Sequence, residues 1–350
     1  MSFQNEIVKW YELNKRSLPW RNTRDPYVIW LSEIILQQTR VEQGLPYFNR
    51  FLSHYPGITD FANAEETQIL KLWQGLGYYS RGRNMLYTAR QIRDNHQGIF
   101  PNTYDKLVAL KGIGEYTAAA ISSFSSDESK AVLDGNVFRV LSRYFGIDTP
   151  INSTEGKKTF SALAQSLIAG QTPSIYNQAI MEFGALQCKP KSPDCPSCPL
   201  QAGCEAKTKG TVALLPVKLK KLKKRIRYFN YFICEEEGEL LVRKRGPGDV
   251  WQELYDFPLI ETENHFTEVP EQFSHALQEY FGKEVVIKPL AAYKHLLTHQ
   301  TIFVQFFGLD NYIINFKVKA DIKRVSLSEF DGLPQPKVIA NFIESYTTKQ

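Results

Sequence analysis

The chain of 350 residues contains no uninterrupted apolar run long enough to cross a bilayer. Its first residues, Met-Ser-Phe-Gln-Asn-Glu, also lack the basic region and the apolar core of a signal peptide. These two absences argue against membrane and secreted classes. We therefore expect a cytoplasmic protein.

Cysteine is scarce, and its distribution argues against a disulfide framework. The chain has five cysteines, four of which follow the spacing Cys188-x6-Cys195-x2-Cys198-x5-Cys204. Such clustering in a cytoplasmic chain indicates a metal centre. Structural zinc favours two short cysteine pairs that lie far apart. This run has only one short pair, so an iron–sulfur cluster suits it better.

Acidic residues are missing from residues 206–227, which carry nine Lys and Arg. The net charge of the whole chain is only +5, so the remainder of the chain is net negative. The basic charge is therefore concentrated in one segment. A segment of this kind either attracts a polyanion or serves as a solvated linker.

Alternating strand patterns are missing from residues 85–182, where the apolar spacing is helical. From Tyr228 onward the pattern becomes strand-like. A chain of this length is expected to form two domains. We predict an all-α domain at 1–205, a basic linker at 206–227 and an α+β domain at 228–350. The expected elements include the helices Asn5–Asn14, Tyr27–Thr39, Tyr116–Phe124 and Glu271–Phe281 and the strands Val285–Ile287, Ala291–His295 and Thr301–Leu309.

A glycine-punctuated stretch follows Leu110 and reads Lys-Gly-Ile-Gly-Glu-Tyr-Thr-Ala-Ala-Ala-Ile. Gly112 and Gly114 precede a helical run, which predicts a tight connection between two helices. Unpaired N–H groups at the start of the second helix suit an anion such as a phosphate. On the turn alone, an ordinary corner between helices is the better interpretation. Eighteen residues after Tyr116, Asp134 stands in an apolar setting.

A second carboxylate, Glu33, lies in a strongly apolar run. Asp25-Pro26 predicts a helix start, and between Tyr27 and Leu36 only Ser32 and Glu33 are polar. Burial favours the neutral form of a carboxylic acid, which is the form that a general acid needs near neutral pH. On this helix alone, pairing with a basic residue or exposure on a wet face is equally compatible.

These motifs resemble known DNA repair enzymes. Leu-x-Gly-Ile-Gly-x-x-Thr-Ala followed by Val-Leu-Asp-Gly-Asn-Val-x-Arg resembles the helix-hairpin-helix DNA glycosylases. Ser-Glu-Ile-Ile-Leu-Gln-Gln-Thr-Arg-Val, residues 32–41, resembles one subgroup, the MutY-type adenine DNA glycosylases. The cysteine spacing also matches the run that endonuclease III and MutY-type enzymes share, which holds a [4Fe–4S] cluster. The resemblance covers about residues 16–340.

The resemblance implies removal of adenine mispaired with 8-oxoguanine or guanine in duplex DNA, by a monomer associated with the nucleoid. Glu33 would protonate N7 of the extruded adenine, and Asp134 would stabilise the sugar cation, with Tyr116 and Asn136 beside them. The residues expected to contact DNA or a base are Arg16, Trp20, Arg21, Gln38, Tyr78, Arg81, Gly112, Gly114, Gln178, Leu297, Thr298 and His299. Without the resemblance, Trp20 and Arg21 suit the edge of a core.

The C-terminal part resembles the Nudix-like domain of MutY proteins, through Leu-Leu-Val-Arg-Lys-Arg at 240–245 and the run Trp251–Pro258. A catalytic Nudix domain needs a glutamate-rich helix to hold Mg²⁺. Here the corresponding helix has Glu279 as its only carboxylate after Glu271, so we expect binding without hydrolysis. The family's Phe-Ser/Thr-His loop, which recognises 8-oxoguanine, is matched by Leu297–His299, and leucine lacks the aromatic ring for stacking.

Three other activities are alternatives to adenine removal. A bifunctional glycosylase–lyase like endonuclease III carries a lysine two residues after the second hairpin glycine. That position is Tyr116 here, and Lys111 precedes the first glycine. A non-catalytic DNA-binding module gives no reason to bury Glu33 and Asp134. A diphosphate hydrolase would need the missing glutamates. We therefore expect a monofunctional adenine DNA glycosylase.

Overall fold

The computed structural model describes residues 2–219, 224–264, 285–310 and 322–348. It divides into two compact units. The first comprises Met1–Ala64 and Asn84–Lys221, and the second comprises Glu65–Arg83 and Leu222–Gln350. No described helix is long and apolar enough to cross a membrane.

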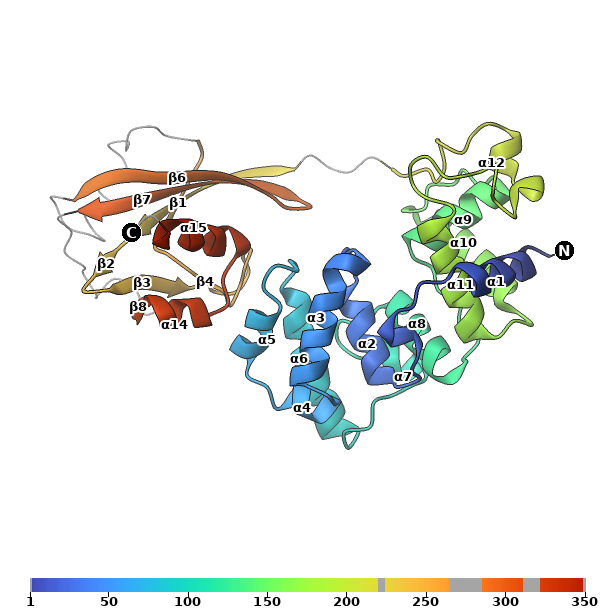
Figure 1. The fold of residues 1–350 in the computed structure, drawn as a ribbon, viewed down its shortest axis with the longest axis horizontal. Coiled ribbons are helices and arrows are strands. Elements are labelled where there is room, and N and C mark those ends of the chain that lie inside the picture. Colours follow the sequence, from blue (N-terminus) through green and yellow to red (C-terminus); the bar gives the residue numbers. More distant parts are fainter. Residues whose placement is uncertain (1, 220–223, 265–284, 311–321, 349–350) are drawn as a thin grey trace. The chain divides into compact units, whose positions relative to one another are not determined.

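Helices build the whole of the first unit and also occur in the second (Figure 1). In chain order they are α1 (Phe3–Asn14), the 3-10 turn η1 (Pro19–Arg21), α2 (Pro26–Ile35), α3 (Val41–His54), α4 (Ile58–Ala62), α5 (Glu66–Leu72), α6 (Ser80–Asn95), α7 (Tyr104–Val108), α8 (Glu115–Ser126), α9 (Gly135–Phe145), α10 (Thr154–Ile168), α11 (Pro173–Leu186), η2 (Gln201–Gly203) and α12 (Glu205–Thr208).

Helix α2 begins as predicted but ends earlier than predicted. The Asp25 side chain accepts a hydrogen bond from Tyr27 N at 2.8 Å, and Pro26 occupies the first turn. The helix stops at Ile35 instead of Thr39, because Leu36–Thr39 forms a turn in which Gln38 has a φ of 59°. A non-glycine residue with positive φ cannot continue a right-handed helix.

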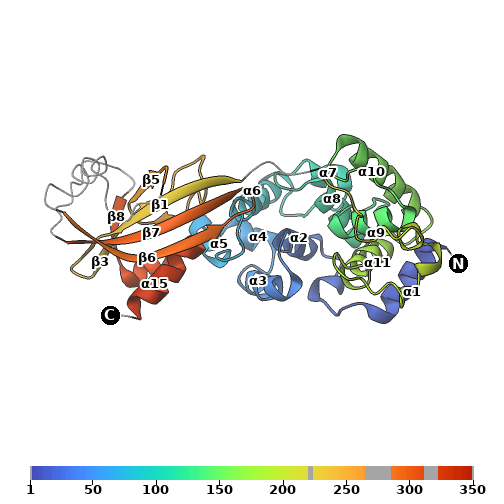
Figure 2. The ribbon, with the colours of Figure 1, turned by 90° about the horizontal axis from the view of Figure 1, so that it is seen from above.

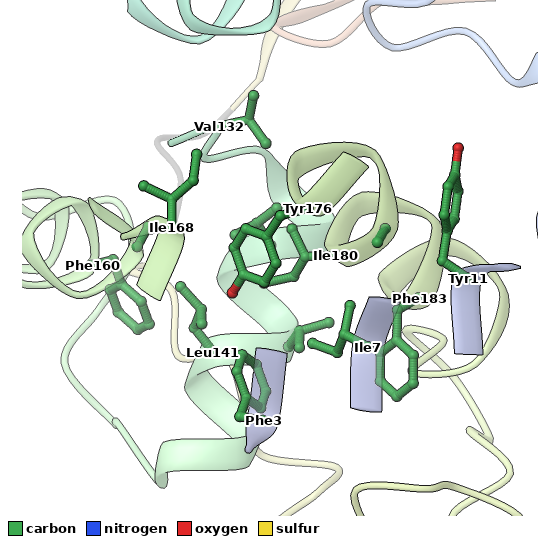
Figure 3. Packing of buried hydrophobic residues seen from close by; sticks show 14 of the residues in the cluster. Phe3, Ile7, Tyr11, Val132, Leu141, Phe160, Ile168, Tyr176, Ile180 and Phe183 are labelled. Carbon is green, nitrogen blue, oxygen red and sulfur yellow. The ribbon is translucent and has the colours of Figure 1, made fainter. Parts of the chain in front are cut away.

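The core of the first unit lies where the start of the chain meets its later helices. Phe3 and Ile7 of α1 pack with Ile180 and Phe183 of α11 and with Leu141 of α9, as Figure 3 shows. All five side chains are almost fully buried. This packing holds α1 against α11, and η1, which follows α1 in the chain, contacts α2.

Two small sheets build most of the second unit. The strands are β1 (Arg225–Ile233), β2 (Glu235–Glu236), β3 (Glu239–Lys244), β4 (Tyr255–Asp256), β5 (Leu259–Thr262), β6 (Val286–Leu296), β7 (Gln300–Asp310) and β8 (Ile322–Ser326), and the helices after them are α14 (Leu327–Gly332) and α15 (Lys337–Thr347). One sheet has the order β5-β1-β7-β6, with β1 and β7 parallel (Figure 2). The other has the order β2-β3-β4, and β8 pairs with β3.

The strand predictions differ from the structure in one respect. The stretches predicted as Val285–Ile287 and Ala291–His295 form one strand, β6, which has a register shift between Pro289 and Ala291. Proline has no N–H for the ladder, so an irregularity at this point keeps the strand paired on both sides. The predicted helix Glu271–Phe281 lies outside the described residues.

Candidate active site

A cavity of about 480 Å³ opens in the first unit, within the range of roughly 300–1,000 Å³ that is typical of ligand pockets. It gathers predicted site residues from positions that are far apart in the sequence. These residues are Arg16, Trp20, Arg21, Glu33, Tyr116, Asp134, Asn136 and Gln178. The sequence predictions for a catalytic pocket therefore converge on one place.

Glu33 is a buried carboxylic acid, with 8% of its surface exposed. The Tyr116 hydroxyl donates a hydrogen bond to Glu33 Oε2 at 2.7 Å. Burial raises the pKa of Glu33 to about 7; the bond from Tyr116 opposes this rise, and the charge of Asp134 adds to it. Glu33 can therefore carry a proton near neutral pH. Within the described part of the chain, Glu33 has a tyrosine and no basic residue as its hydrogen-bond partner, so the pairing with a basic residue that the helix pattern left open is not what the structure has.

Asp134 has a different environment, because it caps the N-terminus of α9. Its Oδ1 accepts from the backbone N–H groups of Asn136 and Val137, both at 2.8 Å, and its Oδ2 accepts from Asn136 Nδ2 at 2.7 Å. Burial raises the pKa of Asp134, and these three donors oppose the rise. Donors at a helix start favour the ionised carboxylate. The cavity thus holds two different carboxyl groups: Glu33 accepts one hydrogen bond, and Asp134 accepts three.

Arg16 and Arg21 share a partner that the sequence analysis did not identify. Both guanidinium groups donate to the carboxylate of Glu182, on α11, at 2.7–2.9 Å. Trp20 packs edge-on against Phe48 and also lines the cavity. Glu182 is the only charged residue of α11 and stands among apolar neighbours. The signal that singled out Glu33 is therefore present at Glu182 too.

Gln178 lies one turn before Glu182 on the same helix and lines the same cavity. Its Oε1 accepts a hydrogen bond from the Tyr11 hydroxyl at 3.0 Å. That bond orients the amide, so that its NH₂ group remains as a donor. Gln178 therefore lines the cavity with an amide whose orientation Tyr11 fixes.

Gln38 and Tyr78 lie outside this cavity. Gln38 is exposed in the turn after α2 with a φ of 59°, and Tyr78 is 40% exposed with a φ of 48°. Left-handed backbone is uncommon for both residue types and often marks a functional turn. Each side chain is thus presented by a tight turn.

The glycine pair forms the predicted connection between α7 and α8. Gly112 has a φ of +79°, and a Cβ there would lie 2.9 Å from Asn84 Cβ. Gly114 directly precedes α8 and caps its N-terminus. The backbone therefore requires glycine at 112, and the start of α8 stays open to an anion.

A second cavity, of about 520 Å³, lies within the second unit. Leu297, Thr298 and His299 form the turn between β6 and β7 and line it, and the Tyr78 and Thr298 hydroxyls are hydrogen-bonded. The Arg81 guanidinium donates to the carbonyls of Leu76 and Gly77. Burial lowers the pKa of Arg81 to about 10. Arg81 thus holds the turn that carries Tyr78.

The four clustered cysteines lie in one neighbourhood after α11. The thiol of Cys198 interacts electrostatically with those of Cys188, Cys195 and Cys204. Arg143 Nη1 donates to Cys188 Sγ at 3.5 Å. Among the described residues, no group of three or more His, Cys, Asp or Glu side chains is arranged to hold a single metal ion.

Comparisons with known proteins agree with this geometry. A family model described as "HhH-GPD superfamily base excision DNA repair protein" matches residues 31–166, and one described as "NUDIX domain" matches residues 230–345. An adenine DNA glycosylase of Buchnera aphidicola subsp. Baizongia pistaciae is 34% identical over 86% of this chain and 84% of that protein. That of Mus musculus is 40% identical over 59% of this chain and 42% of that protein.

A solved structure, a thermostable thymine-DNA glycosylase, is 29% identical with a TM-score of 0.55, covering 59% of this chain and 95% of that one. Together these matches confirm the predicted combination of a helix-hairpin-helix glycosylase fold and a Nudix-like fold. The chain belongs to the adenine DNA glycosylase family of base excision DNA repair enzymes.

Proposed function

We propose that this enzyme removes adenine that is paired with 8-oxoguanine or guanine in duplex DNA, through Glu33 and Asp134. The observation that carries the proposal is the contrast between these two carboxyl groups in one cavity. Glu33 is buried with a pKa near 7, whereas Asp134 accepts three hydrogen bonds at a helix start. Glycosidic bond cleavage uses such a pair, one protonated and one ionised.

The proposed reaction breaks the bond between adenine N9 and sugar C1′. Extrusion of the nucleotide brings adenine into the cavity, where Glu33 gives its proton to N7. Adenine then leaves with the electron pair of the broken bond, and C1′ acquires positive charge. Asp134 stabilises that charge, and the oxygen of a water molecule adds to C1′, while the water's proton restores Glu33.

We propose that the enzyme stops at the abasic site. A lyase step needs an amine to form a Schiff base with C1′. The hairpin position that carries this lysine in bifunctional enzymes is Tyr116, whose hydroxyl is committed to Glu33. A strand break is therefore not expected to accompany base release.

We assign recognition of the opposite base to Thr298 and His299. Both lie at the β6–β7 turn and carry groups that can hydrogen-bond the edge of 8-oxoguanine. Leu297 takes the position of the family's aromatic residue and would supply only an apolar contact. The functional division that we propose is catalysis in residues 1–205, a basic linker at 206–227 and base recognition in 228–350, acting as a monomer on DNA at the nucleoid.

We propose a [4Fe–4S] cluster as the resident cofactor, held by Cys188, Cys195, Cys198 and Cys204. The donor set fits, because the four thiols lie together and Arg143 offers a cation beside Cys188. Thiolates hold such clusters. Burial raises the pKa of Cys188, and the Arg143 guanidinium opposes that rise. When bound, the cluster would shape the loop that carries Lys189 and Lys191, and it takes no part in the chemistry above.

The test is single-turnover adenine release from a duplex with adenine opposite 8-oxoguanine, comparing the parent chain with Glu33→Gln. Because glutamine cannot donate the proton, we expect release to slow by roughly 10²–10⁴-fold. Glu12→Gln, at an exposed position of α1, is the matched control. If the parent leaves adenine intact and instead cuts DNA carrying an oxidised pyrimidine, the endonuclease III-type activity replaces this proposal.

A further inference from the structure

We propose that Glu182 is a positioning residue for base excision: its carboxylate fixes the guanidinium of Arg21 at the cavity wall, where the remaining donors of Arg21 meet an acceptor atom of the extruded base. This inference rests on the proposed function. Glu182 itself would not touch the base. It acts through Arg21 and, by its charge, on Glu33.

Five hydrogen bonds hold the Glu182 carboxylate in position. Oε1 accepts from Arg16 N, Arg16 Nε and Arg21 Nη1, each at 2.9 Å, and Oε2 accepts from Arg16 Nη2 and Arg21 Nη2, each at 2.7 Å. Only 1% of the Glu182 side chain is exposed. Burial acts to raise the pKa of Glu182, but the bonds from Arg21 and Arg16 outweigh it and lower the pKa to about 2. The carboxylate is therefore charged at every pH at which the enzyme would work.

The geometry leaves part of Arg21 for a ligand. Nη1 uses both of its hydrogens, one for Glu182 and one for the carbonyl oxygen of Arg16 at 3.0 Å, and Nη2 uses one for Glu182. The second Nη2 hydrogen and the Nε hydrogen have no hydrogen-bond partner within the described part of the chain. The ring of Tyr11 lies 5.7 Å from the guanidinium carbon and limits its movement. Arg21 is thus a pre-oriented donor on the cavity wall.

The same carboxylate influences the acid. The positive charge of Arg21 lowers the pKa of Glu33. By Coulomb's law, a negative charge paired with Arg21 acts in the opposite direction, and Glu182 carries that charge. The other charged or titratable groups that line the cavity are Tyr116 from α8, Asp134 and Arg139 at the start of α9, Glu42 of α3 and Arg40 directly before it. Loss of the Glu182 charge would therefore leave Arg16 and Arg21 uncompensated and favour the ionised form of Glu33.

The test uses the full chain with Glu182→Gln, and Glu12→Gln as a control that removes the same charge from an exposed position of α1. Adenine release is measured at saturating enzyme across a pH series, and binding is measured on a duplex with a non-cleavable adenine analogue. We expect release by Glu182→Gln to slow by roughly 10–100-fold, because misplacing a group in a reacting complex can cost about 10²-fold. Binding is expected to stay within about twofold, since phosphate contacts dominate it.

The pH series separates positioning from mere support of the fold. Glu33 acts in its protonated form, so the rate falls as pH rises through its pKa. Because Glu182→Gln lowers that pKa, the falling limb should move to lower pH by roughly half a unit or more. The proposal would be overturned if the falling limb of the rate–pH profile does not move. It would also be overturned if DNA binding and melting temperature fall as much as the rate of release.

Arg21→Lys is the second variant, for the case in which Glu182→Gln does not fold. Lysine keeps the charge near Glu33 but cannot form the double contact with Glu182. We expect Arg21→Lys to release adenine more slowly, with the falling limb of the rate–pH profile at the parental pH. Release at the parental rate would refute the role of Arg21. If the parent chain itself releases no adenine, the proposed function fails and the positioning role has no reaction to support.

Discussion

At the scale of single residues, Tyr116 sets the strength of the acid. Its hydroxyl donates to Glu33 Oε2 at 2.7 Å, and this bond lowers the pKa of Glu33 against the effect of burial. The hydrogen bond from Tyr116 therefore holds the pKa of Glu33 near neutral pH and keeps that pKa from rising further. Two neighbours of Glu33 thus act on its pKa in the same direction, since the charge of Arg21 also lowers it.

We predict that Tyr116→Phe moves the falling limb of the rate–pH profile to higher pH by roughly half a unit. Without the donor, the ionised form of Glu33 loses stabilisation, so its pKa rises and the protonated acid persists to higher pH. The measurement is single-turnover adenine release across a pH series, with Tyr87→Phe, an exposed tyrosine, as the control. A limb that moves to lower pH would contradict this account of Tyr116.

Two of the carboxylates that line the cavity could be predicted from the sequence alone. Glu33 could be predicted because it is the one carboxylate in an apolar helical run, and Asp134 because it follows a recognisable glycine hairpin. Glu182 has the same signal within α11 and was missed. The sequence gives no indication that Arg16 and Glu182 meet, because 166 positions separate them. Contacts of this kind follow from packing, which a local pattern does not contain.

At the scale of elements, the contact between α11 and α9 positions Asp134, the carboxylate that we propose stabilises the sugar cation. A Cβ at Gly184 would lie 2.6 Å from Asn136 Cβ, so the two helices approach as closely as glycine permits. Asn136 in turn donates to Asp134 Oδ2 at 2.7 Å. The position of Asp134 therefore depends on a glycine in another helix.

We predict that Gly184→Ala destabilises the protein by about 1–3 kcal/mol, because the added methyl group must push α9 and α11 apart. It should also slow adenine release more than it weakens DNA binding, since Asn136 and Asp134 move with α9. Thermal melting and single-turnover release test both effects. Gly332→Ala, at a position where an added Cβ meets nothing within 4 Å, is the control. Parental release and stability in Gly184→Ala would disprove the packing argument.

Element boundaries were predicted less well than element types. The start of α2 was predicted from Asp25-Pro26, whereas its end at Ile35 was not. The residues Gln37, Gln38 and Thr39 carry no helix-breaking signal, and the left-handed backbone at Gln38 arises from the turn as a whole. Likewise, the strands predicted at Val285–Ile287 and Ala291–His295 are one strand, because a register shift inside β6 cannot be read from the pattern.

At the scale of the whole molecule, the proposed function divides two tasks between separate parts of the chain. In that proposal, Glu33 and Asp134 act on adenine, while Thr298 and His299 contact the base opposite. We predict that His299→Ala lowers the preference for 8-oxoguanine over guanine by roughly tenfold, as expected for one lost base contact. The rate on the guanine mispair should change little, because that base lacks the 8-oxo group.

The measurement is the ratio of adenine release rates on the two mispairs. His54→Ala, at an exposed histidine of α3, is the control. Equal losses on both mispairs would assign His299 to general DNA binding and remove its role in base recognition.

The link between Arg16 and Glu182 also has a consequence for synthesis of the protein. The cavity wall joins residues that leave the ribosome 166 positions apart, which corresponds to about 8–33 s at the usual rates of translation of ~5–20 residues per second. Before α11 emerges, Glu33 lacks the side of the cavity that α11 forms, and Arg21 lacks its partner Glu182. A nascent chain would therefore carry the acid early but gain the ability to select a base only once α11 has emerged.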